Sequence, residues 1–176
     1  FTRYFGGRQG LSDNAISAIA EDKDGYIWVG TMGGLDRLDP RTGSIVRYQN
    51  TPNDARSLSC NQVRSLLVDA EGTLWVGTGF FFDGSNDGGL NRYRPETNDF
   101  DRFLSKKGDP SSLRGNEVRT IYEDKKGNLW VGTDGDGLHR MDKKHGTFKH
   151  FGNSTEPQHS LSAPKAPRSW RPQATF

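Results

Sequence analysis

One heptad occurs three times in the chain, and its spacing constrains the fold more than any other feature. The copies read Gly-Tyr-Ile-Trp-Val-Gly-Thr at residues 25–31, Gly-Thr-Leu-Trp-Val-Gly-Thr at 72–78 and Gly-Asn-Leu-Trp-Val-Gly-Thr at 127–133. Their tryptophans are about 47 and 55 residues apart, and periods of this length are typical of repeat architectures. The chain is therefore expected to consist of repeated units, each built around one heptad.

Each heptad has the pattern of a strand that is buried on both faces. Side chains alternate along a strand, so Trp28 and Gly30 share one face, and the other face carries Ile27, Val29 and Thr31. The small glycine is expected to leave room for a neighbouring aromatic ring. An aspartate stands three residues before the first glycine of each copy, as Asp22 stands before Gly25. This spacing is typical of a tight hairpin, so each heptad is predicted to be the second strand of one.

Three further segments recur with each heptad. In the first unit a strand is expected near residues 15–21, a Gly-Leu-x-Arg pattern begins another at 34–37, and an aromatic strand follows at 45–48. Four short strands with turn signals at this spacing predict an antiparallel meander, repeated around an axis as in a β-propeller. No segment has helical periodicity over the length of a helix, so the expected class is all-β.

The repeats divide the chain into three complete blades and two partial ones. Known propellers close with about 4 to 8 blades, so the chain is predicted to be an incomplete propeller. Its open faces are expected to meet further blades of a longer parent chain, or other copies by self-association. The predicted units are 1–10 (last strand of a preceding blade and a linker), 11–57 (blade 1), 58–112 (blade 2), 113–160 (blade 3) and 161–176 (a truncated or irregular, proline-containing tail).

Composition excludes several other classes of protein. The formal net charge is only +2, with acids and bases interleaved, so no nucleic-acid partner is expected. No apolar run reaches the roughly 18 residues of a membrane span, so no membrane contact is expected within this segment. The single cysteine excludes an internal disulfide, and no cofactor is indicated. A hydrophobic share of 31% with 22 glycines suits a glycine-rich β protein.

The repeats also resemble a known family. The pattern Leu-Ser-x-Asn, then Asp-x-x-Gly-x-Ile/Leu-Trp-Val-Gly-Thr, then Gly-Leu-x-Arg is similar to the two-component regulator propeller repeat, and the resemblance covers residues 1–162. The chain departs from the pattern at Ser59-Cys60 and Arg114-Gly115, which replace Ser-Asp before the asparagine. The resemblance implies the periplasmic sensor region of a membrane-anchored histidine kinase, often a hybrid kinase and response regulator, or of a diguanylate cyclase.

The resemblance further implies that the chain binds a ligand, such as an oligosaccharide, and catalyses nothing itself. Two alternatives belong to other classes: an interaction scaffold whose blades assemble with protein partners, and a propeller enzyme of lyase or glycosidase type. The four histidines lack metal-ligand spacing and do not pair recognisably with the cysteine or with a serine nucleophile, so no catalytic residue and no metal site are predicted.

The repeats differ most in the loop between their second and third strands, and variation on one face often marks a binding face. Blade 2 carries an insertion at 80–87, which contains three adjacent phenylalanines that are costly to leave in water. We expect packing within the chain or a protein interface there first, and ligand stacking second. The candidate ligand-binding residues of this face are Phe80, Phe81, Phe82, Asp83, Asn86, Asp134 and Asp136.

The segment 83–88 has oxygen ligands spaced as in calcium loops. The twelfth position of an EF-hand requires a glutamate, and Arg94 stands there, so a polar loop tip is favoured over a calcium site. Three repeated residue types also have two interpretations each. For the tryptophans (Trp28, Trp75, Trp130), packing in the core is favoured over stacking against sugars. For the arginines (Arg37, Arg92, Arg140), pairing with the hairpin aspartates is favoured over binding of anions. For the asparagines (Asn14, Asn61, Asn116), formation of a turn is favoured over a ring of side chains at the channel mouth.

Overall fold

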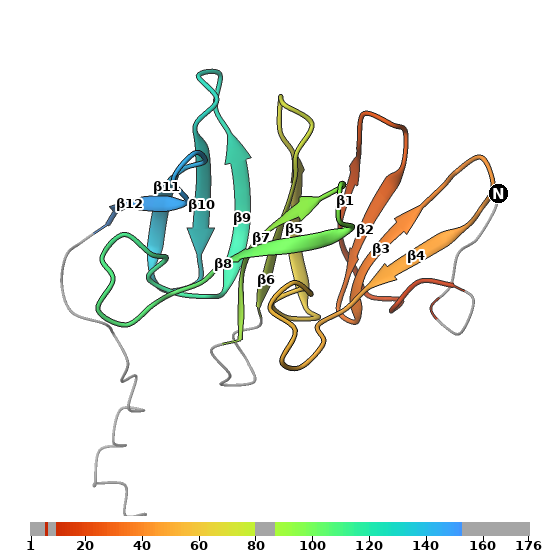
Figure 1. The fold of residues 1–176 in the computed structure, drawn as a ribbon, viewed down its shortest axis with the longest axis horizontal. Coiled ribbons are helices and arrows are strands. Elements are labelled where there is room, and N and C mark those ends of the chain that lie inside the picture. Colours follow the sequence, from red (N-terminus) through yellow and green to blue (C-terminus); the bar gives the residue numbers. More distant parts are fainter. Residues whose placement is uncertain (1–5, 7–9, 80–86, 153–176) are drawn as a thin grey trace, which may run out of the picture.

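The computed structural model describes residue 6 and residues 10–79 and 87–152 of the chain. Within these ranges the regular elements are all β-strands, and they form three separate four-stranded sheets (Figure 1). Strands follow one another in chain order across each sheet, and every neighbouring pair is antiparallel. The all-β class and the meander predicted for each repeat are therefore confirmed.

Each sheet corresponds to one repeat of the sequence, and we call the sheets blades 1, 2 and 3. Blade 1 contains β1 (Ile16–Glu21), β2 (Ile27–Thr31), β3 (Gly34–Leu38) and β4 (Ile45–Tyr48). Blade 2 contains β5 (Val63–Val68), β6 (Leu74–Gly79), β7 (Gly88–Arg94) and β8 (Asp99–Phe103). Blade 3 contains β9 (Val118–Glu123), β10 (Leu129–Thr133), β11 (Gly137–Asp142) and β12 (Thr147–Phe151).

The three blades stand side by side, with their first strands β1, β5 and β9 adjacent to one another (Figure 1). The described strands do not close a ring, so the fold is an incomplete β-propeller. The loops between second and third strands lie beside the entries of the first strands, because the amide of Asp134 donates to the carbonyl of Glu117 and that of Gly79 donates to Gln62. This places those loops on one face, as expected for strands that alternate direction.

The hairpin between the first two strands of each blade closes through its aspartate. In blade 1, Asp22 Oδ1 accepts hydrogen bonds from the amides of Asp24 and Tyr26, both at 3.0 Å. Gly25 follows with a φ of 81°, which a residue with a Cβ adopts only with strain. The same contacts recur in the other two blades. The predicted hairpin chemistry is confirmed.

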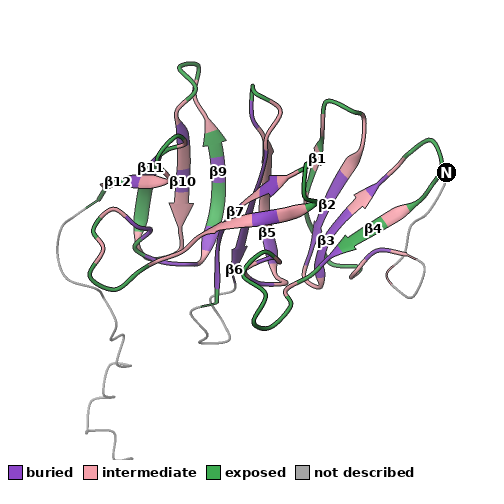
Figure 2. Ribbon diagram, viewed as in Figure 1, coloured by how far each residue is buried: buried purple, intermediate pink, exposed green. Residues whose placement is uncertain are grey.

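Two apolar cores fill the interfaces between blades (Figure 2). Trp28 and Trp75, each 1% exposed, lie at the first and second interface respectively, which confirms the core-packing interpretation for both. The prediction that an aromatic ring packs against the heptad glycine is wrong, because a Cβ on Gly30 would instead meet Val63 of the next blade. The glycine thus allows a valine of the following first strand to approach the heptad closely.

The two outer faces of the array remain open. Ile19 on blade 1 is 67% exposed and Tyr122 on blade 3 is 61% exposed. On blade 3, Trp130 is only half-buried, although its counterparts in the first two blades are covered. These faces have the apolar residues of an interface, and no neighbouring blade covers them within the described part of the chain.

Candidate functional site

Each hairpin aspartate also holds the tryptophan of its own blade. The indole Nε1 donates to the second carboxylate oxygen over 2.7 Å from Trp28 to Asp22, 2.8 Å from Trp75 to Asp69 and 2.9 Å from Trp130 to Asp124. The predicted pairing of these aspartates with the repeated arginines is therefore wrong. The indole, and not the guanidinium, donates to the aspartate. The tryptophan stands six residues after the aspartate, on the strand that follows the hairpin turn, and its side chain faces the hairpin.

The repeated arginines stand opposite the tryptophans in the register, as Arg37 does opposite Trp28. Their partners differ from blade to blade. Arg92 is bound to its cross-strand neighbour Asp101, with Nη2 and Oδ2 2.6 Å apart. Arg37 instead donates from Nη1 to the hydroxyl of Tyr93 in the next blade, at 3.2 Å.

The repeated asparagines connect consecutive blades. Asn61 Oδ1 accepts a hydrogen bond from the amide of Asn50 at 2.6 Å, and Asn116 Oδ1 accepts one from the amide of Ser105 at 2.7 Å. Each donor lies in the loop that arrives from the preceding blade. The favoured prediction of a turn-forming side chain is therefore wrong, because each asparagine side chain fixes the connecting loop rather than a turn of its own segment.

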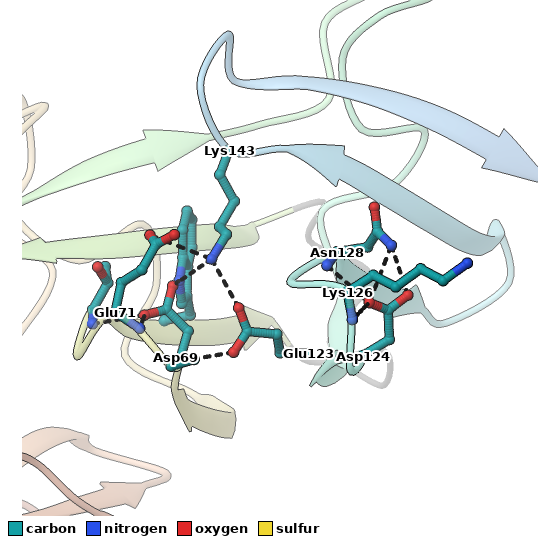
Figure 3. A network of polar contacts seen from close by, with 10 residues as sticks. Asp69, Glu71, Glu123, Asp124, Lys126, Asn128 and Lys143 are labelled. Carbon is teal, nitrogen blue, oxygen red and sulfur yellow. Dashed lines mark hydrogen bonds and ion pairs between the residues drawn. The ribbon is translucent and has the colours of Figure 1, made fainter.

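A partly buried ion cluster lies at the turn side of the second interface (Figure 3). Lys143, in the turn between β11 and β12, places Nζ 3.0 Å from Asp69 Oδ2 and 2.9 Å from Glu123 Oε1. Glu71 adds a third oxygen at 3.5 Å, and the amide of Ala70 donates to the other oxygen of Glu123. The lysine of blade 3 thereby reaches the hairpin of blade 2 and fills the space between the two blades.

Burial and pairing oppose each other in this cluster, and pairing prevails. Burial alone would raise the pKa of Asp69, but hydrogen bonds from Trp75 and Thr73 and the nearby ammonium hold that pKa below its usual value. Burial would likewise lower the pKa of Lys143, yet bonds to Glu123 and Asp69 raise it above its usual value. Asp69 and Lys143 are therefore both charged at neutral pH.

The corresponding part of the first interface lacks this lysine. Three residues beyond the repeated arginine, blade 2 has Pro95 where blade 3 has Lys143, and Val68 stands where blade 3 has Glu123. A groove of about 640 Å³ opens between blades 1 and 2 at this place. We call it the first groove.

Aromatic rings and an arginine form the deep part of the first groove. The guanidinium of Arg37 lies over the ring of Tyr26, 4.8 Å from its centroid, and 5.6 Å from that of Trp28. Trp28 in turn packs edge-on against Tyr93 with centroids 4.8 Å apart. The rim carries the exposed carboxylates Asp24, Glu71 and Glu96 and the ammonium of Lys23.

Asn98 ties the two walls of the first interface together below the groove. Its Oδ1 accepts hydrogen bonds from the hydroxyls of Tyr48 at 2.7 Å and Tyr93 at 2.8 Å, one from each blade. Burial is the main cause that raises the pKa of Tyr48 above its usual value, so its hydroxyl stays a protonated donor. These two hydrogen bonds connect blades 1 and 2 through a single side chain.

The ligand-binding residues predicted from sequence are only partly described. Phe80, Phe81, Phe82, Asp83 and Asn86 lie outside the described residues, and so does most of the candidate calcium loop. Asp134 and Asp136 are described. Asp134 Oδ2 lies 3.2 Å from Arg119 Nη1, and the carboxylate of Asp136 lies against Gly115. The predicted face stays a prediction.

Two histidines meet in blade 3, which the sequence analysis did not anticipate. His139 and His150 are cross-strand neighbours, with their Nδ1 atoms 2.6 Å apart, and His139 Nε2 lies 2.9 Å from Thr133 Oγ1. Burial, His150 and Arg114 lower the pKa of His139 to about 4. Strand register was the missing signal, since the same two positions hold Asn91 and Arg102 in blade 2.

The heptad regions match a family model. The model is the two component regulator propeller, and it matches residues 10–33, 57–80 and 112–135. These segments contain the strand-one entry, the hairpin aspartate and the tryptophan of all three blades. Each of the three blades therefore contains one two component regulator propeller repeat. The resemblance drawn from the sequence is thereby confirmed.

Relatives of known description fit this family. A histidine kinase of Formosa agariphila is 44% identical over 50 residues, which is 28% of this chain and 4% of that protein. An extracellular domain assigned to a hybrid two component system of Bacteroides thetaiotaomicron aligns with a TM-score of 0.72 and 29% identity, covering 87% of this chain and 21% of that one. The regulator propeller chain thus spans about a fifth of the length of this structural relative.

Virginiamycin B lyase of Staphylococcus aureus shares the fold alone. It aligns with a TM-score of 0.57 at 14% identity, over 88% of this chain and 45% of the lyase. That likeness supports the propeller architecture and carries no argument about chemistry. The described part of the regulator propeller chain contains no helix long and apolar enough to cross a membrane.

Proposed function

We propose that this chain is part of the extracytoplasmic sensor propeller of a two-component signalling protein, and that the propeller detects an oligosaccharide. Binding and a shift in conformation, not catalysis, would carry the signal. One observation carries the proposal: the three repeats and their packing match an extracellular domain of a hybrid two component system over 87% of the chain. The kinase relative supports the same kind of output for the complete protein.

The open outer faces support a place within a larger propeller. Trp130, Leu138 and Phe151 on blade 3 occupy the positions that Trp28, Leu35 and Tyr48 occupy in the first interface. The latter three are buried against blade 2, whereas Leu138 is 41% exposed. We propose that a further blade of the parent chain covers the blade 3 face. A second copy of the chain is the alternative occupant.

A binding screen tests the sensing role. The complete extracytoplasmic region that includes these repeats would be titrated by calorimetry with neutral and acidic oligosaccharides of two to six sugars. Saturable binding of at least one, with a matching change in kinase or other output activity in the full-length protein, is the expected result. Silence across all saccharides would remove the proposed ligand class, while output that responds to a non-carbohydrate ligand would leave the sensor role standing.

A further inference from the structure

Arg37 in the first groove has no carboxylate partner within the described part of the chain. Its contacts are the hydroxyl of Tyr93 at 3.2 Å and the rings of Tyr26 and Trp28. Its side chain is half-buried and borders the groove of about 640 Å³. Ring stacking uses the faces of a guanidinium and leaves the N–H groups at its edge for hydrogen bonds in the guanidinium plane.

Blade 2 shows what completes such an arginine. Arg92 occupies the same repeat position as Arg37 and is bound by Asp101, which stands directly opposite on the next strand. The residue opposite Arg37 is Val46, which cannot supply a carboxylate. Blade 1 therefore keeps the cation of this pair and lacks its anion. Arginine and carboxylate form two parallel hydrogen bonds, so a carboxylate from outside fits this position.

The rest of the groove limits what else the ligand carries. Asp24, Glu71 and Glu96 line the rim with exposed carboxylates, which accept hydrogen bonds from hydroxyl groups. Lys23, Arg92 and Arg94 also line the groove, so its acidic and basic side chains are equal in number. The volume lies within the usual range of small-molecule sites, roughly 300 to 1,000 Å³.

We propose that the first groove binds a hexuronate unit of an oligosaccharide, with its single carboxylate on Arg37 and its hydroxyls on the acidic rim. This assignment rests on the proposed sensing of oligosaccharides and adds the charged sugar and its place between two blades. At the corresponding place of the second interface, the chain's own Lys143 already pairs with the carboxylates of Asp69 and Glu123.

Calorimetry on the full chain tests the charge of the ligand. The probes are di- and trisaccharides of galacturonate and of glucuronate, compared with the neutral galactose and glucose oligosaccharides of the same linkage. We expect at least one uronate series to bind at least tenfold more tightly than its neutral counterpart. Binding should weaken between 50 and 500 mM salt because it depends on an ion pair.

Two variants test the position. Arg37→Ala should lose at least tenfold in uronate affinity, and Arg37→Lys should recover part of the loss because it restores charge without the paired geometry. Arg119→Ala is the matched control, since this arginine is exposed and pairs with Asp134 on the opposite face. The control should bind uronate as the wild type does.

A transplant of the second-interface lysine tests the site even if Arg37→Ala fails to fold. Pro95→Lys combined with Val68→Glu copies Lys143 and Glu123 into blade 2, opposite Asp22, and should abolish binding while leaving the thermal midpoint unchanged or higher. Unchanged affinity in the transplant or in folded Arg37→Ala would overturn the groove assignment. Equal affinity for neutral sugars would overturn the hexuronate while the proposed oligosaccharide sensing stands, and no saccharide binding at all would overturn both of these.

Discussion

The two interfaces between blades share one backbone design and differ in chemistry. The first is aromatic and neutral below an open groove, with the hydroxyls of Tyr48 and Tyr93 meeting on Asn98. The second is closed by Lys143 between Asp69 and Glu123. The hairpin aspartate and its tryptophan are the same at both. The repeated residues thus determine the backbone of each blade. The residue in the turn between the third and fourth strands, Lys143 or Pro95, determines whether an ion pair spans the space between neighbouring blades.

The largest expected difference between the interfaces follows from removing the hairpin aspartate. Asp69→Ala leaves Lys143 without its buried partner and Trp75 without its acceptor, so we expect a loss of about 3 to 5 kcal/mol in the free energy of unfolding. Asp22→Ala removes the same tryptophan bond beside an open groove that water can enter, so about 1 to 2 kcal/mol is expected. Urea unfolding of both variants measures the difference. Equal losses would contradict the distinction between the interfaces.

Removing the lysine should cost somewhat less. Lys143→Met keeps the aliphatic stem and leaves two carboxylates facing each other, and we expect a loss of about 2 to 3 kcal/mol at pH 7. The pKa of Asp69 is held below its usual value, so the stabilisation is present above the pKa of the unfolded chain and disappears as pH falls through the folded one. The gap between variant and wild type should therefore close below about pH 4, as followed by unfolding at several pH values. A gap that persisted at pH 2 would show that packing, not charge, is lost.

The pH dependence of stability should also distinguish the two interfaces, because of His139. This residue lies on the face of blade 3 that packs against blade 2, in the second interface. Because its pKa in the folded chain is about 4, below the usual value of 6.5, the unfolded chain binds the proton more readily. Stability should be complete above pH 6.5 and decline by about 2 to 3 kcal/mol toward pH 4.

The control for this effect comes from blade 2, where the same position holds Asn91. His139→Asn should remove the decline between pH 6.5 and 4 and leave the acid response of Asp69 below it. Thermal midpoints in a pH series would show this directly. A decline of unchanged size in the variant would assign it to another group.

The smallest effect is expected away from both interfaces. Arg119 and Asp134 form an exposed pair, with side chains 53% and 37% exposed. Arg119→Ala should change stability by at most about 0.5 kcal/mol, because solvent and salt weaken such pairs. A larger loss in thermal unfolding would mean that the first strands of the blades depend on charge as well as on packing.

Local patterns were sufficient to predict the blades. Hairpins, strand order and the buried tryptophans follow from residues close together in the chain, such as Asp22, Gly25 and Trp28. The partner of the hairpin aspartate was predicted wrongly as an arginine. The sequence does contain the correct partner, since a tryptophan stands six residues after this aspartate in all three repeats. An indole N–H and a guanidinium can both donate to a carboxylate, and only the orientation of the side chains decides between them.

The groove was beyond prediction for a different reason. It depends on a contact between residues 74 positions apart, from Lys143 to Asp69, and on the lack of its equivalent at Pro95. Nothing in the sequence around Pro95 indicates a groove, because its meaning appears only by comparison with Lys143 at the same position of blade 3. The predicted loop face at Phe80, Asp83 and Asn86 lies outside the described residues, so its role stays a prediction.

The turn position of Pro95 and Lys143 has an evolutionary consequence. Since every blade secures its own hairpin through the aspartate and tryptophan, that turn can change without endangering the unit that carries it. If the first groove binds a ligand as proposed, duplication of such a unit followed by a few substitutions at this turn and in the facing strand would convert an ion-paired interface into a binding site, or the reverse. An array of many blades would then hold a series of sites that diversify independently, each able to acquire a ligand without a new fold.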